Sequence, residues 1–282
     1  MMNKCSEDFQ DKTLRQENKF DFFNYGKGRE IINELYSLEK FLDDMVFISD
    51  GRNYACCHNM VFSLQRVLIS AELTMGSIIN CCEAACIADA NTLLRKYRDD
   101  LFFYLYVTVY NEDKKIEGSN KEISKMEGKV SEWLDNGLKD LSIGTVLKAI
   151  KSSSVLIESV TKFELKQAFE KIGLKLNNYV HSNGYNYYNM SFNEYDDYAK
   201  IMESLVNDAK FITVSFLFLL ILCVPSSIMA TDFTDYLDMG ICSTADSQYL
   251  VAPFVEEFLY SHISMIDEKC LAYLKDRTSM KL

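Results

Sequence analysis

The stretch Ser77–Tyr110, SIINCCEAACIADANTLLRKYRDDLFFYLYVTVY, decides how this chain folds. It holds no proline and no glycine, so nothing in it breaks a helix. Small residues dominate its first half, which would let a neighbouring helix approach closely, and a leucine and aromatic stripe flanked by charge fills its second half. The stretch therefore predicts one long helix at the centre of a helical bundle.

Segments on both sides of this stretch carry the same helical period. Their apolar residues recur every three or four positions. The expected helices cover residues 30–48, 54–74, 121–134, 162–181 and 193–224, with a last one after Pro253. With only 2 prolines and 11 glycines in 282 residues, we predict an all-α, multi-helix bundle.

We expect residues 1–29 to be a loosely ordered segment and residues 30–282 to form a single helical domain. Thr74-Met75-Gly76 is expected to kink or break its helix. Asn111–Gly118 is expected to be a charged loop that opens a small excursion over residues 111–144.

One apolar run could be mistaken for a membrane span. Phe211–Ala230 is uncharged and long enough on paper to cross a bilayer. Its strongly apolar part ends at Val224, however, before Pro225, and no positive cluster flanks it. We therefore predict a buried core helix and no membrane partner, with membrane association kept as an alternative.

Composition narrows the classes of function. The formal charge of -11 provides no general attraction to nucleic acid, so RNA binding would need a local patch. Nine cysteines, an odd number without a secretion signal, indicate reduced thiols in the cytoplasm. The chain has no Gly-rich phosphate loop, HExxH, GxSxG or dinucleotide fingerprint, so it is predicted to need no cofactor.

Cysteines and one histidine suggest a zinc site at first sight. They are Cys56, Cys57, His58, Cys81, Cys82 and Cys86. Adjacent cysteines are poor tetrahedral partners and no Cys-x-x-Cys pair occurs, so core packing is the better interpretation and no metal is predicted.

The best candidate for chemistry is Leu174–Gly184, LKLNNYVHSNG, at the end of an amphipathic helix. It carries His181, one of only three histidines. Asn177 and Asn178 precede it by four and three residues, so the three side chains share one flank. Lys175 lies six residues before His181.

This segment, with Leu93-Leu94-Arg95 and the acidic pair Asp99-Asp100, resembles the HEPN superfamily of helical bundles found in bacterial toxin–antitoxin and anti-phage defence systems. The resemblance covers roughly residues 60–110 and 150–225. It implies a homodimer and, in catalytic members, metal-independent RNA cleavage by an arginine followed four to six residues later by a histidine. Lys175 occupies the position of that arginine.

Lysine in place of arginine leaves two expectations open. His181 could transfer a proton and Lys175 could stabilise phosphate charge, in a ribonuclease. Lysine offers a point charge without the bidentate geometry of arginine, so the alternative is a catalytically degenerate member.

A second match to the same pattern is Arg52 followed by His58, near a helix start that favours an anion. A further alternative is a non-catalytic interaction module that binds a partner protein through the loop Tyr185–Tyr188 and an acidic surface.

Overall fold

A computed structural model describes residues 26–49, 53–57, 60–118, 120–135, 143–181, 183, 195–240, 250–278 and 280. In these ranges the chain is an all-α multi-helix bundle with one short β-hairpin, as the sequence predicts. The first half consists of α2 (Lys27–Ile48), β1 (Tyr54–Cys57), β2 (Met60–Ser63), α3 (Gln65–Glu83), α4 (Ile87–Glu117), α5 (Lys121–Leu134) and α6 (Ile143–Ser152). The second half consists of α7 (Ile157–Lys162), α8 (Leu165–Val180), α10 (Tyr195–Cys223), η1 (Pro225–Ile228), α11 (Thr231–Asp238), α12 (Pro253–His262), η2 (Ile263–Met265) and α13 (Cys270–Arg277).

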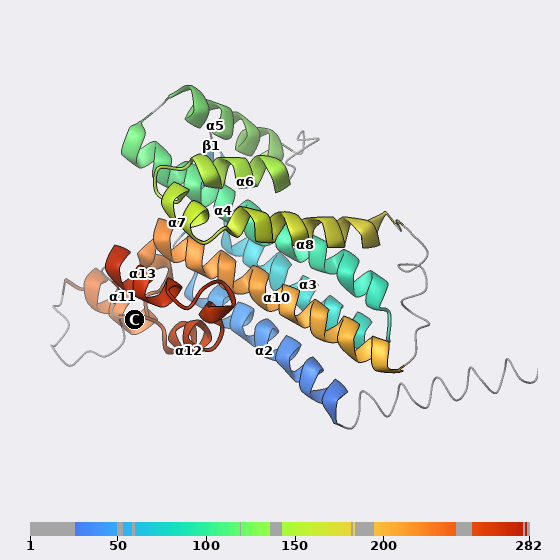
Figure 1. The fold of residues 1–282 in the computed structure, drawn as a ribbon. Helices are drawn as coiled ribbons and strands as arrows, with labels where there is room; N and C mark the ends of the chain where they lie inside the picture. Colours follow the sequence, from blue (N-terminus) through green and yellow to red (C-terminus); the bar gives the residue numbers. More distant parts are fainter. Residues whose placement is uncertain are drawn as a thin grey trace, which may run out of the picture.

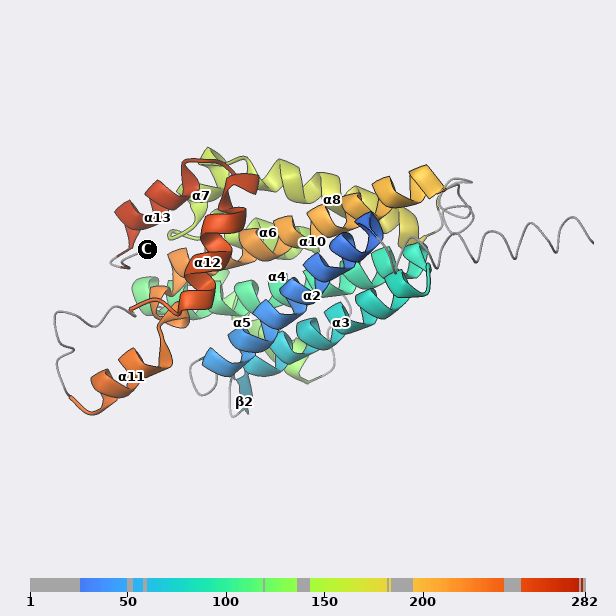
Figure 2. The same ribbon diagram turned by 90° about the horizontal axis from the view of Figure 1, so that it is seen from below.

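The long helix α4 is the centre of the bundle. Every residue from Leu101 to Tyr110 is buried, because α3, α5, α6, α8 and α10 all pack against it. The α3 and α10 helices pack along α4, and α2 lies against α3 and α10 (Figure 1 and Figure 2). A helix that is buried on all sides has apolar residues on all sides, and Leu101–Tyr110 has this pattern.

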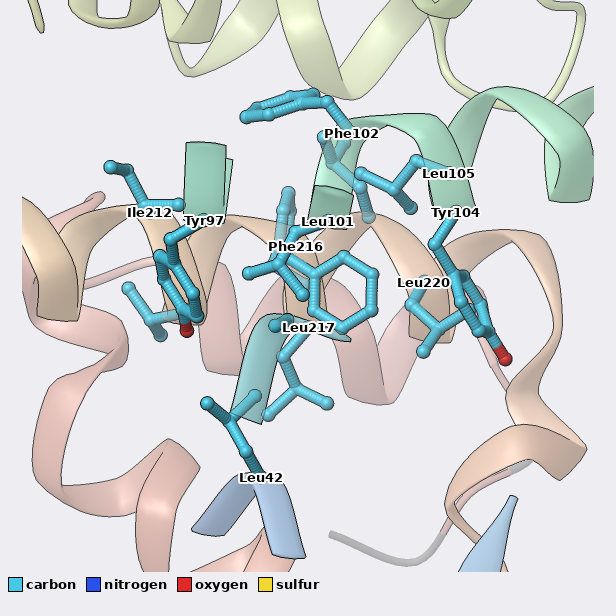
Figure 3. Packing of buried hydrophobic residues seen from close by; sticks show 14 of the residues in the cluster. Leu42, Tyr97, Leu101, Phe102, Tyr104, Leu105, Ile212, Phe216, Leu217 and Leu220 are labelled. Atoms are coloured by element: carbon cyan, nitrogen blue, oxygen red, sulfur yellow. The ribbon is translucent and has the colours of Figure 1, made fainter. Parts of the chain in front are cut away.

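The deepest packing lies between α4 and α10. Figure 3 shows Tyr97, Leu101 and Tyr104 from α4 against Phe216 and Leu220 from α10, with all five fully or almost fully buried. The hydroxyl groups of Tyr97 and Thr213 share a hydrogen bond of 2.7 Å, which satisfies both polar atoms inside the core.

The α10 helix is the apolar segment considered as a membrane span. Among the described residues it alone is long and apolar enough to cross a bilayer, over Ala199–Cys223. However, 72% of its most apolar stretch is buried inside the protein, by α4, α2, α12 and α13. That burial is typical of a core helix, and length and composition by themselves are weak evidence for a span.

Two helix predictions were wrong at the start of the bundle. The predicted helix over 77–110 is divided, because α3 ends at Glu83 and α4 begins at Ile87. Ala85 occupies the corner at φ 62°, and the amide of Cys86 donates to the carbonyl of Cys81 across it. Tyr54–Cys57 and Met60–Ser63 pair as antiparallel strands rather than forming the start of a helix, with Tyr54 opposite Ser63.

Two expected breaks do not occur. The α3 helix continues unbroken through Gly76, and the side chain of Glu39 from α2 covers that glycine. The α4 helix continues through the predicted loop over 111–118 to Glu117, where Gly118 at φ 71° ends it. Charge in its last turns is paired within the helix, as in the 2.5 Å contact between Lys115 and Glu112.

Candidate functional site

The candidate site lies on α8, which is amphipathic as predicted. Leu165, Phe169, Ile172, Leu176 and Tyr179 are buried on one side of this helix. The ring of Phe169 meets Phe102 of α4 edge to face at 4.6 Å and Phe211 of α10 at 5.8 Å. These contacts fix the rotation of α8 on the bundle, and therefore fix which residues point outward.

The opposite side of α8 carries Leu174, Asn177, Asn178 and His181, which we call the outward face of α8. Positions three, four and seven residues after Leu174 return to its side of a helix. Leu174 is 68% exposed, and His181 is exposed just beyond the last helical residue. The backbone amide of His181 donates to the carbonyl of Asn177 at 3.0 Å, which closes the helix end.

The asparagines are half-buried beside this histidine. The side-chain oxygen of Asn178 accepts a hydrogen bond from the side-chain amide of Asn183 at 3.4 Å. The structure therefore brings Asn177, Asn178 and His181 to one surface at the end of α8. An amide and an imidazole can bind polar groups of a ligand, but neither carries a permanent positive charge.

Lys175 lies on a different side of α8. Six helical residues separate it from His181, so the two side chains leave the helix about 120° apart. Its ammonium group donates to Asp208 at 2.5 Å and to the hydroxyl of Ser204 at 2.7 Å, both on α10. The side chains of Lys175 and Asp208 are 29% and 19% exposed. The lysine thus joins α8 to α10 and is directed away from the outward face.

The cations of α4 are also engaged by carboxylates. Arg98 is buried beneath α8, and its guanidinium donates to Asp99 at 2.7 Å and 3.0 Å. Lys96 donates to Asp100 at 2.6 Å. Arg95 lies 3.8 Å from Asp99. The carboxylates in these pairs compensate the positive charge that would otherwise attract a phosphate.

The second candidate, Arg52 with His58, lies outside the described residues. The loop Tyr185–Tyr188, the predicted protein-binding segment of the alternative interpretation, also lies outside the described residues.

The cysteines that the structure describes do not form a metal centre. No group of three or more histidine, cysteine or acidic side chains within the described ranges could hold a metal ion. Cys82 is fully buried, and burial raises the pKa of its thiol far above the ordinary value.

Two features of the structure, one on α8 and one apart from it, were not predicted. Asp208 binds Lys175, but the sequence spacing of two residues on separate helices gives no sign of such a pair. A pocket of about 280 Å³ beside α5 includes Trp133 and Arg66. The one tryptophan of the chain, on a surface helix, was the signal that could have drawn attention to it.

No family model, no curated protein and no solved structure matches this chain.

Proposed function

We propose that this chain is an HEPN-like helical protein of the bacterial defence or toxin–antitoxin type. It is catalytically degenerate: it does not cut RNA, and it acts by binding a partner. The all-α bundle and the histidine at the end of an amphipathic late helix support the HEPN-like part. The geometry of α8 disfavours ribonuclease activity.

The observation that carries this proposal is the engagement of Lys175. Metal-independent cleavage of RNA needs a cation close to the group that transfers the proton, because charge develops on the phosphate. Lys175 is held by Asp208 and Ser204 on the flank that faces α10. His181 is exposed on another side of the helix. Within one chain the two groups therefore do not converge on one phosphate.

The test is RNA cleavage by the purified protein in the presence of a chelator, with His181→Ala alongside. We expect the wild type and the variant to leave the RNA equally intact. Cutting that disappears in His181→Ala, at an unchanged melting temperature, would instead establish a ribonuclease.

A homodimer is the binding partner that we propose first. Leu174 is a large apolar side chain, 68% exposed, on the outward face of α8. On that face, the positions after Leu174 carry amide or imidazole side chains, which hydrogen-bond without the cost of burying a formal charge. Glu170 and Lys171, one turn before Leu174, carry opposite charges that a two-fold contact can pair. A face of this composition suits a two-fold contact in which the same helix of a second copy covers it.

A further inference from the structure

An aromatic pocket lies apart from α8, where β2, α3, α4, α5 and α6 meet. Its volume is about 280 Å³. The ring of Trp133 on α5 lies 4.1 Å from Phe103 of α4 and 5.2 Å from Phe62 of β2, measured between ring centroids. Together these three rings form an apolar wall with room beside it for one small apolar or aromatic group.

Among the described residues, three charged side chains line the same pocket: Arg66 at the start of α3, and Asp99 and Asp100 of α4. Arg66 is exposed and makes no hydrogen bond or ion pair with any residue that the structure describes. The pocket therefore contains charges of both signs that do not neutralise one another directly.

The two carboxylates have acceptor capacity left. Asp99 receives the guanidinium of Arg98 on Oδ1, and its Oδ2 lies 3.8 Å from Arg95. Asp100 receives Lys96 at 2.6 Å and Ser70 at 2.9 Å, both on Oδ2. Its Oδ1 has no hydrogen-bond partner within the described part of the chain. Each carboxylate is thus fixed in place through one oxygen and can accept a further donor through the other.

We propose that this pocket binds a free α-amino acid with an apolar or aromatic side chain. The guanidinium of Arg66 pairs with the carboxylate of the ligand, since arginine matches carboxylate geometry bidentately. The ammonium of the ligand donates to Asp100 and Asp99, and its side chain packs against the aromatic wall. Arg98, Arg95 and Lys96 already balance the charge of the two carboxylates, so Arg66 is the cation left for the carboxylate of a ligand. The second oxygens of Asp99 and Asp100 remain as acceptors for its ammonium, so a zwitterion uses both kinds of partner.

The position of Trp133 makes this proposal directly measurable. It is the one tryptophan of the chain, so intrinsic tryptophan emission reports on the pocket alone. L-Phenylalanine and L-leucine are titrated into the full chain, with Trp133 emission and calorimetry followed in parallel. Phenethylamine, which lacks the carboxylate, and 3-phenylpropionate, which lacks the ammonium, are the matched probes.

The variant that tests the role of Arg66 is Arg66→Gln, with Arg29→Gln as its control. Both arginines are exposed, and Arg29 lies on α2 and does not line the pocket. Loss of a charged hydrogen-bonding partner should weaken L-phenylalanine binding by about tenfold or more in Arg66→Gln and leave Arg29→Gln unchanged.

Saturable binding of L-phenylalanine or L-leucine that perturbs Trp133 and needs Arg66 supports the proposal. Three results would overturn it. The first is no binding of either amino acid at millimolar concentration, and the second is equal binding by wild type and Arg66→Gln. The third is equal affinity for 3-phenylpropionate and L-phenylalanine, which would make the pocket a site for simple carboxylates.

Discussion

Lys175 on α8 and Asp208 on α10 form a partly buried ion pair with a separation of 2.5 Å between nitrogen and oxygen. The hydroxyl of Ser204 accepts a second hydrogen bond from the same ammonium. A lysine that is committed in this way contributes to the packing of two helices. Its charge is compensated by Asp208 and is not presented at the end of α8, where His181 lies.

The first prediction concerns the stability of that pair. Asp208→Asn should lower the free energy of unfolding by about 1 kcal/mol, because a partly buried ammonium loses its counter-charge. Glu170→Gln is the control, since the pair of Lys166 and Glu170 is about half exposed on each side and lies at 3.3 Å. Its loss should cost less than about 0.5 kcal/mol. Urea unfolding of both variants measures the difference, and equal costs would show that burial of the Lys175 pair adds nothing.

The contact between α8 and α4 leads to a second prediction. A methyl group at Gly173 would lie 3.2 Å from Nη1 of Arg98, whose guanidinium is buried and held by Asp99. Asp99 holds the guanidinium through Nε and Nη2, so the added methyl group crowds Nη1. The cost of this overpacking exceeds the helix-propensity gain of about 1 kcal/mol, and Gly173→Ala should destabilise the fold by up to about 2 kcal/mol.

Gly128→Ala provides the matched control for this substitution. Gly128 is also inside a helix, α5, and has no atom within 4 Å of the added methyl group. There the alanine should stabilise by up to about 1 kcal/mol through helix propensity. If thermal melting moves in the same direction for both variants, the close approach of Arg98 to α8 is not a constraint.

The third prediction is a pH dependence that arises from Asp113. This α4 carboxyl is 7% exposed, and burial raises its pKa above the ordinary 3.8, while hydrogen bonds from Ser153 and Ser154 oppose the rise. A raised pKa in the folded state favours folding at pH below 3.8, and this contribution is lost as pH rises through the folded pKa.

Asp113→Asn removes that titration but retains an oxygen that can accept from both serines. The free energy of unfolding of this variant, relative to wild type, should therefore increase as pH rises from about 3.5 to 7. Chemical denaturation across that range is the measurement, with exposed Asp235→Asn as the control that should show no such trend. A constant difference between Asp113→Asn and wild type would exclude the buried carboxyl as the source.

A fourth prediction follows from the proposed dimer. Leu174→Asp places a charge in the outward face of α8 and should convert a dimer into a monomer in light scattering at micromolar concentration. Leu73→Asp on α3 is the matched control, because Leu73 is 63% exposed and lies off that face. A wild type that is already monomeric, or a dimer that survives Leu174→Asp, argues against this interface.

Much of the bundle could be predicted from periodicity. The α5 helix lies at residues 121–134 as expected, because its start is marked by Asn120, whose side chain accepts from the amides of Glu122 and Ile123. The burial of α4 and α10 could be predicted from runs of large apolar residues without breakers. Here local sequence and tertiary packing favour the same structure.

The features that were missed depend on backbone conformation or on tertiary contacts, which residue type and spacing do not mark. The corner at Ala85 uses a left-handed backbone conformation that alanine rarely adopts, so no residue type marked it. The charged end of α4 was predicted as a loop, although its charges at Lys115 and Glu112 are spaced to pair within a helix and Asp113 accepts hydrogen bonds from Ser153 and Ser154. The pairing of Lys175 with Asp208 depends on how two helices are placed in space, which spacing along one helix cannot reveal.

The most direct measurement is a time course of RNA cleavage by the purified wild type with chelator present, over a set of structured and single-stranded RNAs. His181→Ala and Lys175→Ala are run at matched melting temperature. The engagement of Lys175 by Asp208 predicts intact RNA in all three samples. Cleavage by the wild type that both substitutions abolish would contradict the account, because it would place Lys175 and His181 together at a working site.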